Sequence, residues 1–152
     1  MNAHPTNTLT TPFGPVSLRQ ADGHITALDW CADPGAASPL IAEALAQLAA
    51  YFDHRLTQFD LPIAFARGLT GEVQRQMVAI PIGETRTYGQ IAKLTGASAQ
   101  AVGQACGANP LPVIVPCHRI LGATTLGGYS APGGVDSKVW LLRHEGAAGL
   151  LL

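Results

Sequence analysis

Charged side chains are scarce in this chain of 152 residues: Lys, Arg, Asp and Glu together make up 12%, and the formal net charge is −1. Aromatic residues reach only 6%, whereas hydrophobic residues make up 47%. This balance excludes an intrinsically disordered chain, which needs low hydrophobicity and high charge. The shortage of Lys and Glu argues against a coiled coil. A chain of this length can bury about two-thirds of the surface that its unfolded form exposes, so we expect a packed core.

Long hydrophobic runs and paired cysteines are also missing. No apolar run approaches the roughly 20 residues that cross a bilayer, and the first residues lack the basic and apolar regions of a secretory signal. Three cysteines, Cys31, Cys106 and Cys117, form no disulfide framework and fit a reducing compartment, so we expect a cytoplasmic protein. The cysteines and histidines show no compact zinc spacing, and we expect neither a metal nor a cofactor.

The small net charge hides an asymmetry between the two halves. Residues 1–69 hold three basic and six acidic residues (3 − 6 = −3), whereas residues 70–152 hold six basic and four acidic residues (6 − 4 = +2). No acidic residue occurs between Glu84 and Asp136, a stretch that contains Arg86, Lys93 and Arg119. Such a stretch is consistent with a surface that meets a polyanion. The alternative is chance, because acidic residues are rare throughout the chain.

The first half reads as a small α+β unit without catalytic chemistry. Residues 15–19 and 24–30, separated by a turn at Asp22 and Gly23, predict a β-hairpin. Ser38 followed by Pro39 is a helix start, and apolar residues continue at helical spacing to Phe52. Residues 59–65 predict another short extended segment.

The second half is predominantly helical. We predict a helix over residues 70–80 that begins at Thr70, a short helix over 88–94 capped by Thr87 with Gln90 completing a capping box, and a third helix over 99–107 capped by Ser98. Two helices joined by a short turn with glycine indicate a helix-turn-helix, although an ordinary helical hairpin has the same outline. The last helix carries small residues and glutamines, which suit close approach to another backbone.

Residues 109–121 contain the strongest chemical signal. We predict a short buried strand over residues 113–115, after which Cys117 and His118 follow in succession. A thiolate is a nucleophile, and a neighbouring histidine activates it directly at a bend or through a water molecule. An inert buried cysteine is the alternative. Glu145 ends a predicted helix over residues 135–144, and a carboxylate there would orient His118 if the two side chains meet. The glycine-rich loop over residues 127–134 lacks the ending of a phosphate-binding loop.

Six segments occur in an order that resembles the O6-alkylguanine-DNA alkyltransferase family. They are residues 80–89, 101–103, 109–110, 116–119, 128–130 and 142–146, so that the resemblance covers about residues 68–147. It implies an α/β (α+β) protein with a ribonuclease-H-like sheet domain over residues 1–67. An all-helical domain over residues 68–152 would carry the helix-turn-helix and the alkyl acceptor.

The resemblance also implies a role for each matching residue. Cys117 would accept the alkyl group, His118 would act as its base through a water molecule, and Glu145 would orient His118. Tyr88 would help to rotate the nucleotide out of the duplex, and Asn109 would bridge the helix-turn-helix to the active-site segment. The implied DNA contacts are Tyr88, Ser98, Gln100, Ala101, Gly103 and Arg119, and the implied base pocket consists of Pro112, Ile120, Tyr129 and Ser130.

These roles predict a monomer that binds double-stranded DNA carrying O6-alkylguanine and accepts the alkyl group once, irreversibly. In the family, an arginine usually fills the space left by the flipped base, and this chain has Gln100 at that position. This substitution favours an alternative, a protein that binds alkylated DNA with weak or no repair. A cysteine hydrolase is a third hypothesis, and it would require an oxyanion hole and repeated turnover.

Overall fold

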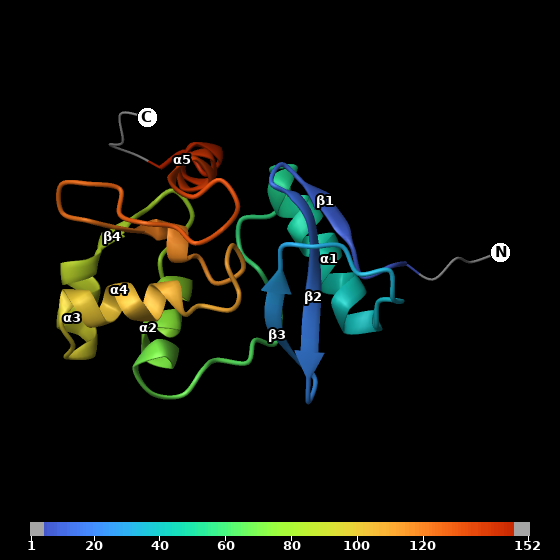
Figure 1. Cartoon of the computed structure of the whole chain (residues 1–152), viewed down its shortest axis with the longest axis horizontal. Helices are drawn as coiled ribbons and strands as arrows, with labels where there is room; N and C mark the ends of the chain where they lie inside the picture. Colours follow the sequence, from blue (N-terminus) through green and yellow to red (C-terminus); the bar gives the residue numbers. More distant parts are fainter. Residues whose placement is uncertain (1–4, 148–152) are drawn as a thin grey trace. The chain divides into compact units, whose positions relative to one another are not determined.

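The computed structural model describes residues 5–147, which divide into two compact units with the boundary between Ala64 and Phe65 (Figure 1). In the first unit, β1 (Leu9–Thr11), β2 (Gly14–Ala21) and β3 (His24–Asp29) form an antiparallel sheet in the order β1-β2-β3. The helix α1 (Pro39–Phe52) packs against all three strands. The predicted hairpin is therefore confirmed, and β1 extends it by one strand.

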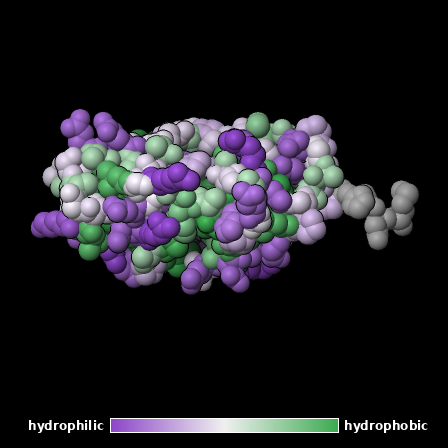
Figure 2. All heavy atoms as spheres, turned by 90° about the horizontal axis from the view of Figure 1, so that it is seen from below, coloured by the Kyte–Doolittle hydropathy of each residue, from purple (hydrophilic) through white to green (hydrophobic). Residues whose placement is uncertain are grey.

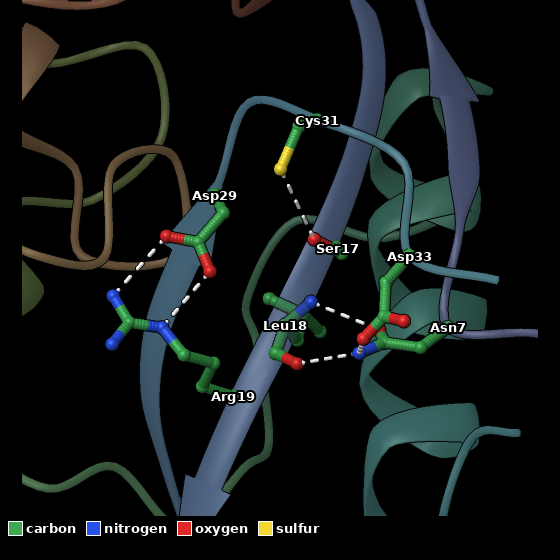
Figure 3. Close-up of polar contacts among 7 residues, drawn as sticks. All are labelled: Asn7, Ser17, Leu18, Arg19, Asp29, Cys31 and Asp33. Atoms are coloured by element: carbon green, nitrogen blue, oxygen red, sulfur yellow. Dashed lines mark hydrogen bonds and ion pairs between the residues drawn. The ribbon is translucent and has the colours of Figure 1, made fainter. Parts of the chain in front are cut away.

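Local caps and one buried side chain fix the ends of these elements. Ser38 accepts a hydrogen bond from the Ile41 amide at 3.1 Å, and Pro39 is the first residue of α1, as predicted. The Asn7 side chain bonds both backbone groups of Leu18, as a neighbouring strand would. It donates to the Leu18 carbonyl at 2.7 Å and accepts from the Leu18 amide at 2.9 Å (Figure 3). The predicted extended segment near residue 63 forms a single parallel bridge between Ile63 and Ile25.

The second unit is helical apart from a two-residue parallel ladder. Its elements are α2 (Gly68–Val78), β4 (Arg86–Thr87), α3 (Tyr88–Thr95), α4 (Ala99–Gly107), the 3₁₀ helix η1 (Cys117–Arg119), β5 (Ile120–Leu121) and α5 (Val135–His144). The ladder joins β4 to β5 in parallel. This ladder is a departure from the expected all-helical domain. It forms because the chain after η1 runs beside the segment that precedes α3.

Both caps predicted for the helix-turn-helix are present. Thr87 and Gln90 form the complete capping box at the start of α3, and Ser98 accepts from the Ala101 amide at 3.1 Å at the start of α4. Gly96 adopts a left-handed conformation, φ 69°, between the two helices. The predicted cap at Thr70 is wrong: α2 begins at Gly68 after Arg67, with no side-chain cap.

The strand predicted over residues 113–115 is also absent, although these residues are buried as expected. The segment is a pair of tight turns in which the Ile114 amide donates to the Pro112 carbonyl and the Val115 amide donates to the Leu111 carbonyl. Val113 has a positive φ of 72°. Internal turn bonds replace the strand because prolines on both sides remove backbone donors and restrict the chain.

Hydrophilic and hydrophobic residues are interspersed over the face that Figure 2 shows. Three large apolar side chains, at Val78, Leu94 and Val135, are exposed. Among residues 5–147, every helix is too short or too polar to serve as a bilayer-spanning segment.

Candidate active site

Cys117 is a free thiol at the first position of η1, and it is 8% exposed. Its amide donates to the Val115 carbonyl at 2.8 Å, so the turn formed by residues 113–116 fixes the direction in which the cysteine leaves the backbone. Burial raises the pKa of the thiol, whereas the Asn109 side chain and the Lys138 ammonium group act to lower it. The thiol is therefore protonated at neutral pH and needs a base to become a nucleophile.

His118 and Glu145 form a fully buried pair beside this thiol. The His118 Nε2 atom lies 2.6 Å from the Glu145 Oε2 atom. Burial raises the pKa of Glu145, but its bonds to His118 and Arg119 outweigh burial and hold that pKa at about 2. Burial lowers the pKa of His118, against the opposing effect of Glu145. The pair therefore consists of a neutral imidazole and an ionised carboxylate, and because the carboxylate only accepts, Nε2 carries the hydrogen.

The other ring nitrogen of His118 is consequently an acceptor. Nδ1 is buried and has no hydrogen-bond partner within residues 5–147. An unprotonated imidazole nitrogen held in place by a carboxylate has the properties of a general base. The predicted orientation of His118 by Glu145 is thus present in the structure.

Arg119 requires a correction, because it was expected at the DNA surface. Its side chain is 8% exposed and donates to both Glu145 oxygens, at 2.8 Å and 3.1 Å, and to the Ile80 carbonyl at 2.6 Å. Because the guanidinium group is buried and three of its five N–H donors bond buried acceptors, it is not placed to contact a DNA phosphate. Arg119 and His118 therefore hold the Glu145 carboxylate together.

Cys117 opens into a cavity of about 440 Å³, a size typical of small-molecule sites. Its lining residues come from α3, α4, η1 and the glycine-rich loop: Tyr88, Gly103, Cys106, Gly107, Cys117, Gly128, Tyr129 and Ser130. The structure therefore brings together Tyr88, Gly103, Tyr129 and Ser130 from the predicted set. Pro112 and Ile120, also predicted for the pocket, are not among these lining residues, and Ile120 is completely buried.

Cys106 was not predicted in the site, although helical spacing could have placed it there. Residues three and four positions after Gly103 lie on the same helix face, and these are Cys106 and Gly107. Burial and the neighbouring Cys117 raise the pKa of the Cys106 thiol to about 12. Cys106 is therefore an uncharged wall of the cavity at neutral pH.

Lys138 is a second residue that sequence reasoning missed. It lies on α5 with no exposed surface, and its Nζ donates to the Ile120 carbonyl at 2.7 Å and to the Gly128 carbonyl at 3.1 Å. The same Nζ lies 5.9 Å from the centre of the Tyr88 ring. Burial lowers the pKa of Lys138 to about 8. The residue links the segment after η1 to the glycine-rich loop, and its position three residues before Leu141 on the buried stripe of α5 was the available signal.

The Asn109 side chain joins α2 to the segment that carries Cys117, whereas the resemblance implied a bridge from the helix-turn-helix. Its Nδ2 donates to the Val115 carbonyl at 2.9 Å, and its Oδ1 accepts from the Leu111 amide at 3.1 Å and from Gln74 Nε2 at 3.2 Å. Gln74 is fully buried on α2 and was not predicted.

The residues expected to meet DNA on α4 lie on an accessible helix start. Ser98 and Gln100 are exposed, and Ala101 and Gly103 are partly exposed. Gly103 also reaches the cavity, so one helix presents both an accessible first turn and a wall of the site. Within residues 5–147, no cluster of three or more His, Cys, Asp or Glu side chains has the geometry to hold a metal ion.

This fold and site are those of a cysteine-dependent enzyme, with the candidate nucleophile on a helix-turn-helix domain. Residues 69–147 match the family described as 6-O-methylguanine DNA methyltransferase, DNA binding domain, and residues 6–65 match its ribonuclease-like domain. The chain belongs to the 6-O-methylguanine DNA methyltransferase family, which confirms the resemblance, the fold class and the enzyme class at the level of the family.

Individual relatives agree with this assignment. The methylated-DNA–protein-cysteine methyltransferase of Mycobacterium bovis is 41% identical over 155 residues, which cover 91% of this chain and 90% of the relative. The Mycobacterium leprae protein of the same name is 37% identical, with 90% and 89% covered. The crystal structure of Mycobacterium tuberculosis OGT in complex with DNA superposes with a TM-score of 0.79 at 39% identity, covering 92% of this chain and 91% of that one.

Proposed function

We propose that this chain repairs DNA by direct reversal, moving an alkyl group from the O6 atom of guanine in duplex DNA to the Cys117 sulfur. The observation that carries the proposal is the position of Cys117 in a cavity beside a neutral His118, which an ionised Glu145 holds. The relatives named above are methyltransferases of methylated DNA, and one was crystallised with DNA.

The reaction begins when His118 removes the Cys117 proton. The sulfur then attacks the alkyl carbon, so that an S–C bond forms as the C–O6 bond breaks. The guanine anion that leaves takes a proton from the Tyr88 hydroxyl, which lies in the wall of the same cavity. Burial raises the pKa of Tyr88, so it holds its proton until this step. The product at Cys117 is a thioether. Because a thiolate is a poor leaving group from carbon, the alkyl group stays on the sulfur and each molecule acts once.

Access to the cavity requires the modified nucleotide to leave the base stack. This extrusion costs a few kcal/mol and least for a damaged pair, so selection for the lesion begins at this step. The accessible first turn of α4 precedes Gly103 and Cys106 in the cavity wall, which makes α4 the element through which DNA binding and the reaction meet.

A lesion sensor without repair is the second candidate function, favoured by one observation. Gln100, exposed on the first turn of α4, offers neither the charge nor the stacking plane of an arginine at the position expected to fill the vacated stack. The presence of Cys117 beside the His118–Glu145 pair favours repair over sensing, because a sensor needs no nucleophile.

The deciding experiment is mass spectrometry of the chain after incubation with duplex DNA containing O6-methylguanine. We expect a gain of one CH₂ unit on Cys117, with at most one group per molecule, and no change at Cys31 or Cys106. The matched controls are Cys117→Ser, which removes the acceptor, and Cys106→Ser, which removes the second thiol of the cavity. Transfer by Cys117→Ser would refute the assignment, and DNA binding without any adduct would establish the sensor instead.

We also propose that the chain acts as a monomer in the cytoplasm. The three cysteines are all free thiols, which suits a reducing compartment. A sedimentation measurement that gives the mass of a dimer would contradict the monomer.

A further inference from the structure

Two free thiols, those of Cys106 and Cys117, lie in the wall of one cavity. Cys106 comes one residue before the end of α4, and Cys117 is the first residue of η1. Both cysteines are therefore at helix ends, where the backbone is held less firmly than in a helix interior. The proposed function uses Cys117 as the acceptor and gives the thiol of Cys106 no chemical role.

A short series of hydrogen bonds through Asn109 joins the backbones of the two cysteines. The Asn109 amide donates to the Cys106 carbonyl at 3.2 Å, and the Asn109 Nδ2 atom donates to the Val115 carbonyl at 2.9 Å. The Val115 carbonyl also accepts from the Cys117 amide at 2.8 Å. The segment between the cysteines is thus folded back on itself, and its two ends are held together.

The two sulfur atoms also share their electrostatic surroundings. Burial raises the pKa of both thiols, and the ammonium group of Lys138 acts on both in the opposite direction. After burial, the charge of Cys117 is the next cause that raises the pKa of Cys106, which reaches about 12. Because the effect of one charge on another weakens with distance, the two sulfur atoms face each other across a short part of the cavity.

We propose that Cys106 is a resolving thiol, which closes a reversible disulfide with Cys117 after a hydroperoxide has oxidised Cys117. Hydrogen peroxide is little larger than a water molecule, which occupies about 30 Å³ in the liquid, so the cavity of about 440 Å³ admits it. Each molecule accepts one alkyl group, and a reversible disulfide preserves an acceptor that further oxidation destroys. The proposal rests on the proposed function only for this benefit, because disulfide formation is a property of the chain alone.

The reaction has two steps, and each releases one water molecule. In the first, the Cys117 sulfur attacks a peroxide oxygen, so that an S–O bond forms as the O–O bond breaks, and the hydroxide that leaves takes the thiol proton. In the second, the Cys106 sulfur attacks the sulfenic acid at Cys117, so that an S–S bond forms as the S–O bond breaks, and the hydroxide takes the Cys106 proton. The two thiols lose two electrons, which the peroxide gains.

The surroundings of the two thiols decide the order of these steps. Cys117 reacts first with peroxide, because it has His118 beside it as a base, whereas the pKa of Cys106 is about 12. Oxidation of Cys117 removes its thiolate charge, and with it one of the two causes that raise the pKa of Cys106. Lys138 still opposes the other cause, burial, so Cys106 loses its proton more readily in the second step than before the first.

The first readout is the mass of one tryptic peptide. The sequence has no Lys or Arg from residue 94 to residue 118, so Cys106 and Cys117 share the peptide that ends at Arg119, and Cys31 belongs to another. The full chain is treated with equimolar hydrogen peroxide at neutral pH, alkylated with N-ethylmaleimide and digested without reductant. We expect the shared peptide to lose two hydrogens and carry no maleimide, and to regain both thiols when dithiothreitol is added before alkylation.

Cys106→Ser isolates the resolving role, and each protein is compared with its own untreated form. Without the second thiol, peroxide should carry Cys117 on to the sulfinic acid, a gain of two oxygens that dithiothreitol does not reverse. After peroxide and then dithiothreitol, the unmodified chain should therefore recover about fivefold more methyl-accepting capacity than Cys106→Ser. The matched control is Cys31→Ser, which removes an exposed thiol from the other unit and should leave the disulfide of the shared peptide in place.

The peptide measurement needs no variant, so it decides the proposal even if Cys106→Ser fails to fold. Oxidation of Cys117 in a chain whose Cys106 still takes the maleimide would overturn the proposal, and so would a link from Cys117 to Cys31 or to a second molecule. The two proposals fail separately. A chain that forms the disulfide but accepts no methyl group contradicts only the repair function, and methyl transfer without the disulfide removes only the role of Cys106.

Discussion

The His118 Nε2 atom and the Glu145 Oε2 atom lie 2.6 Å apart, and neither side chain has exposed surface. The pair joins η1 to the end of α5 across 27 residues of sequence. Arg119 holds the same carboxylate through two hydrogen bonds, so Glu145 is fixed from two sides. One consequence is chemical, because His118 Nδ1 is left as a base, and the other is structural, because three buried charged or polar groups depend on one another.

The chemical consequence predicts a rate effect without a binding effect. His118→Ala should slow methyl transfer by about 10²- to 10⁴-fold while the Kd for methylated DNA changes little, since the imidazole is buried away from the surface. Quench-flow measurement of single turnover and a fluorescence titration report the two quantities. His144→Ala is the matched control, because His144 stacks on Trp140 instead of lining the cavity. A parallel loss of binding and rate in His118→Ala would show that His118 is structural.

The same pair predicts stability that falls in acid. The folded pKa of Glu145 is about 2, below its ordinary 4.5, so the stabilisation it provides is present above 4.5 and is lost as the pH falls toward 2. His118 acts in the same direction: its folded pKa is lowered, so below its ordinary 6.5 the unfolded chain gains a proton that the folded chain resists. We expect the Tm to fall steadily from pH 7.5 to pH 4, measured by calorimetry.

The Glu145→Gln variant tests whether this pair causes the acid sensitivity. An uncharged amide cannot titrate, so the variant should have a lower Tm at pH 7.5 and a flatter dependence on pH below about 4.5. A Tm that stays constant or rises between pH 7.5 and pH 4 in the unmodified chain would contradict the assignment.

Arg119 is predicted to stabilise the fold instead of binding DNA. Replacing it with Met would leave the Glu145 carboxylate without a buried cation, a change that typically costs about 3–5 kcal/mol in the free energy of unfolding. Urea unfolding measures this loss, and Arg143→Met, on the exposed side of α5, should change it little. If Arg119→Met instead kept its stability and lost DNA affinity, the assignment of Arg119 to the buried network would be wrong.

Gln100 is predicted to limit DNA affinity. Gln100→Arg adds a charge and a planar stacking group at the exposed first turn of α4, and we expect binding to strengthen by about 1 kcal/mol. Gln104→Arg, exposed one turn further along α4, adds the charge alone and should gain less. Gln100→Gly should slow single-turnover repair, because nothing then keeps the flipped base from returning. Equal gains for both arginine variants and an unchanged rate for Gln100→Gly would place Gln100 away from the base stack.

Local chemistry was readable from the sequence where a few neighbouring residues decide the outcome. Ser38, Thr87 with Gln90, and Ser98 begin helices because a side-chain oxygen satisfies a free backbone amide two or three residues ahead. Thr70 has the right side chain, yet α2 begins at Gly68, where the left-handed φ of 66° turns the chain into the helix. A residue that can cap a helix makes a helix start possible at its position, and the conformation of the preceding backbone decides at which of the possible positions the helix begins.

The sequence by itself determined the family and singled out Cys117, His118 and Glu145 as the candidate site, because those residue types occur in a fixed order of short segments. Only the tertiary structure decided that Arg119 is buried against Glu145, that Lys138 is enclosed between two carbonyls, and that Cys106 shares the cavity with Cys117. The reason is that burial arises from contacts between segments 10 to 39 residues apart in the sequence. The sequence alone does not distinguish a charged side chain in water from one bonded to a buried partner, because only the packing of the folded chain determines which of the two occurs.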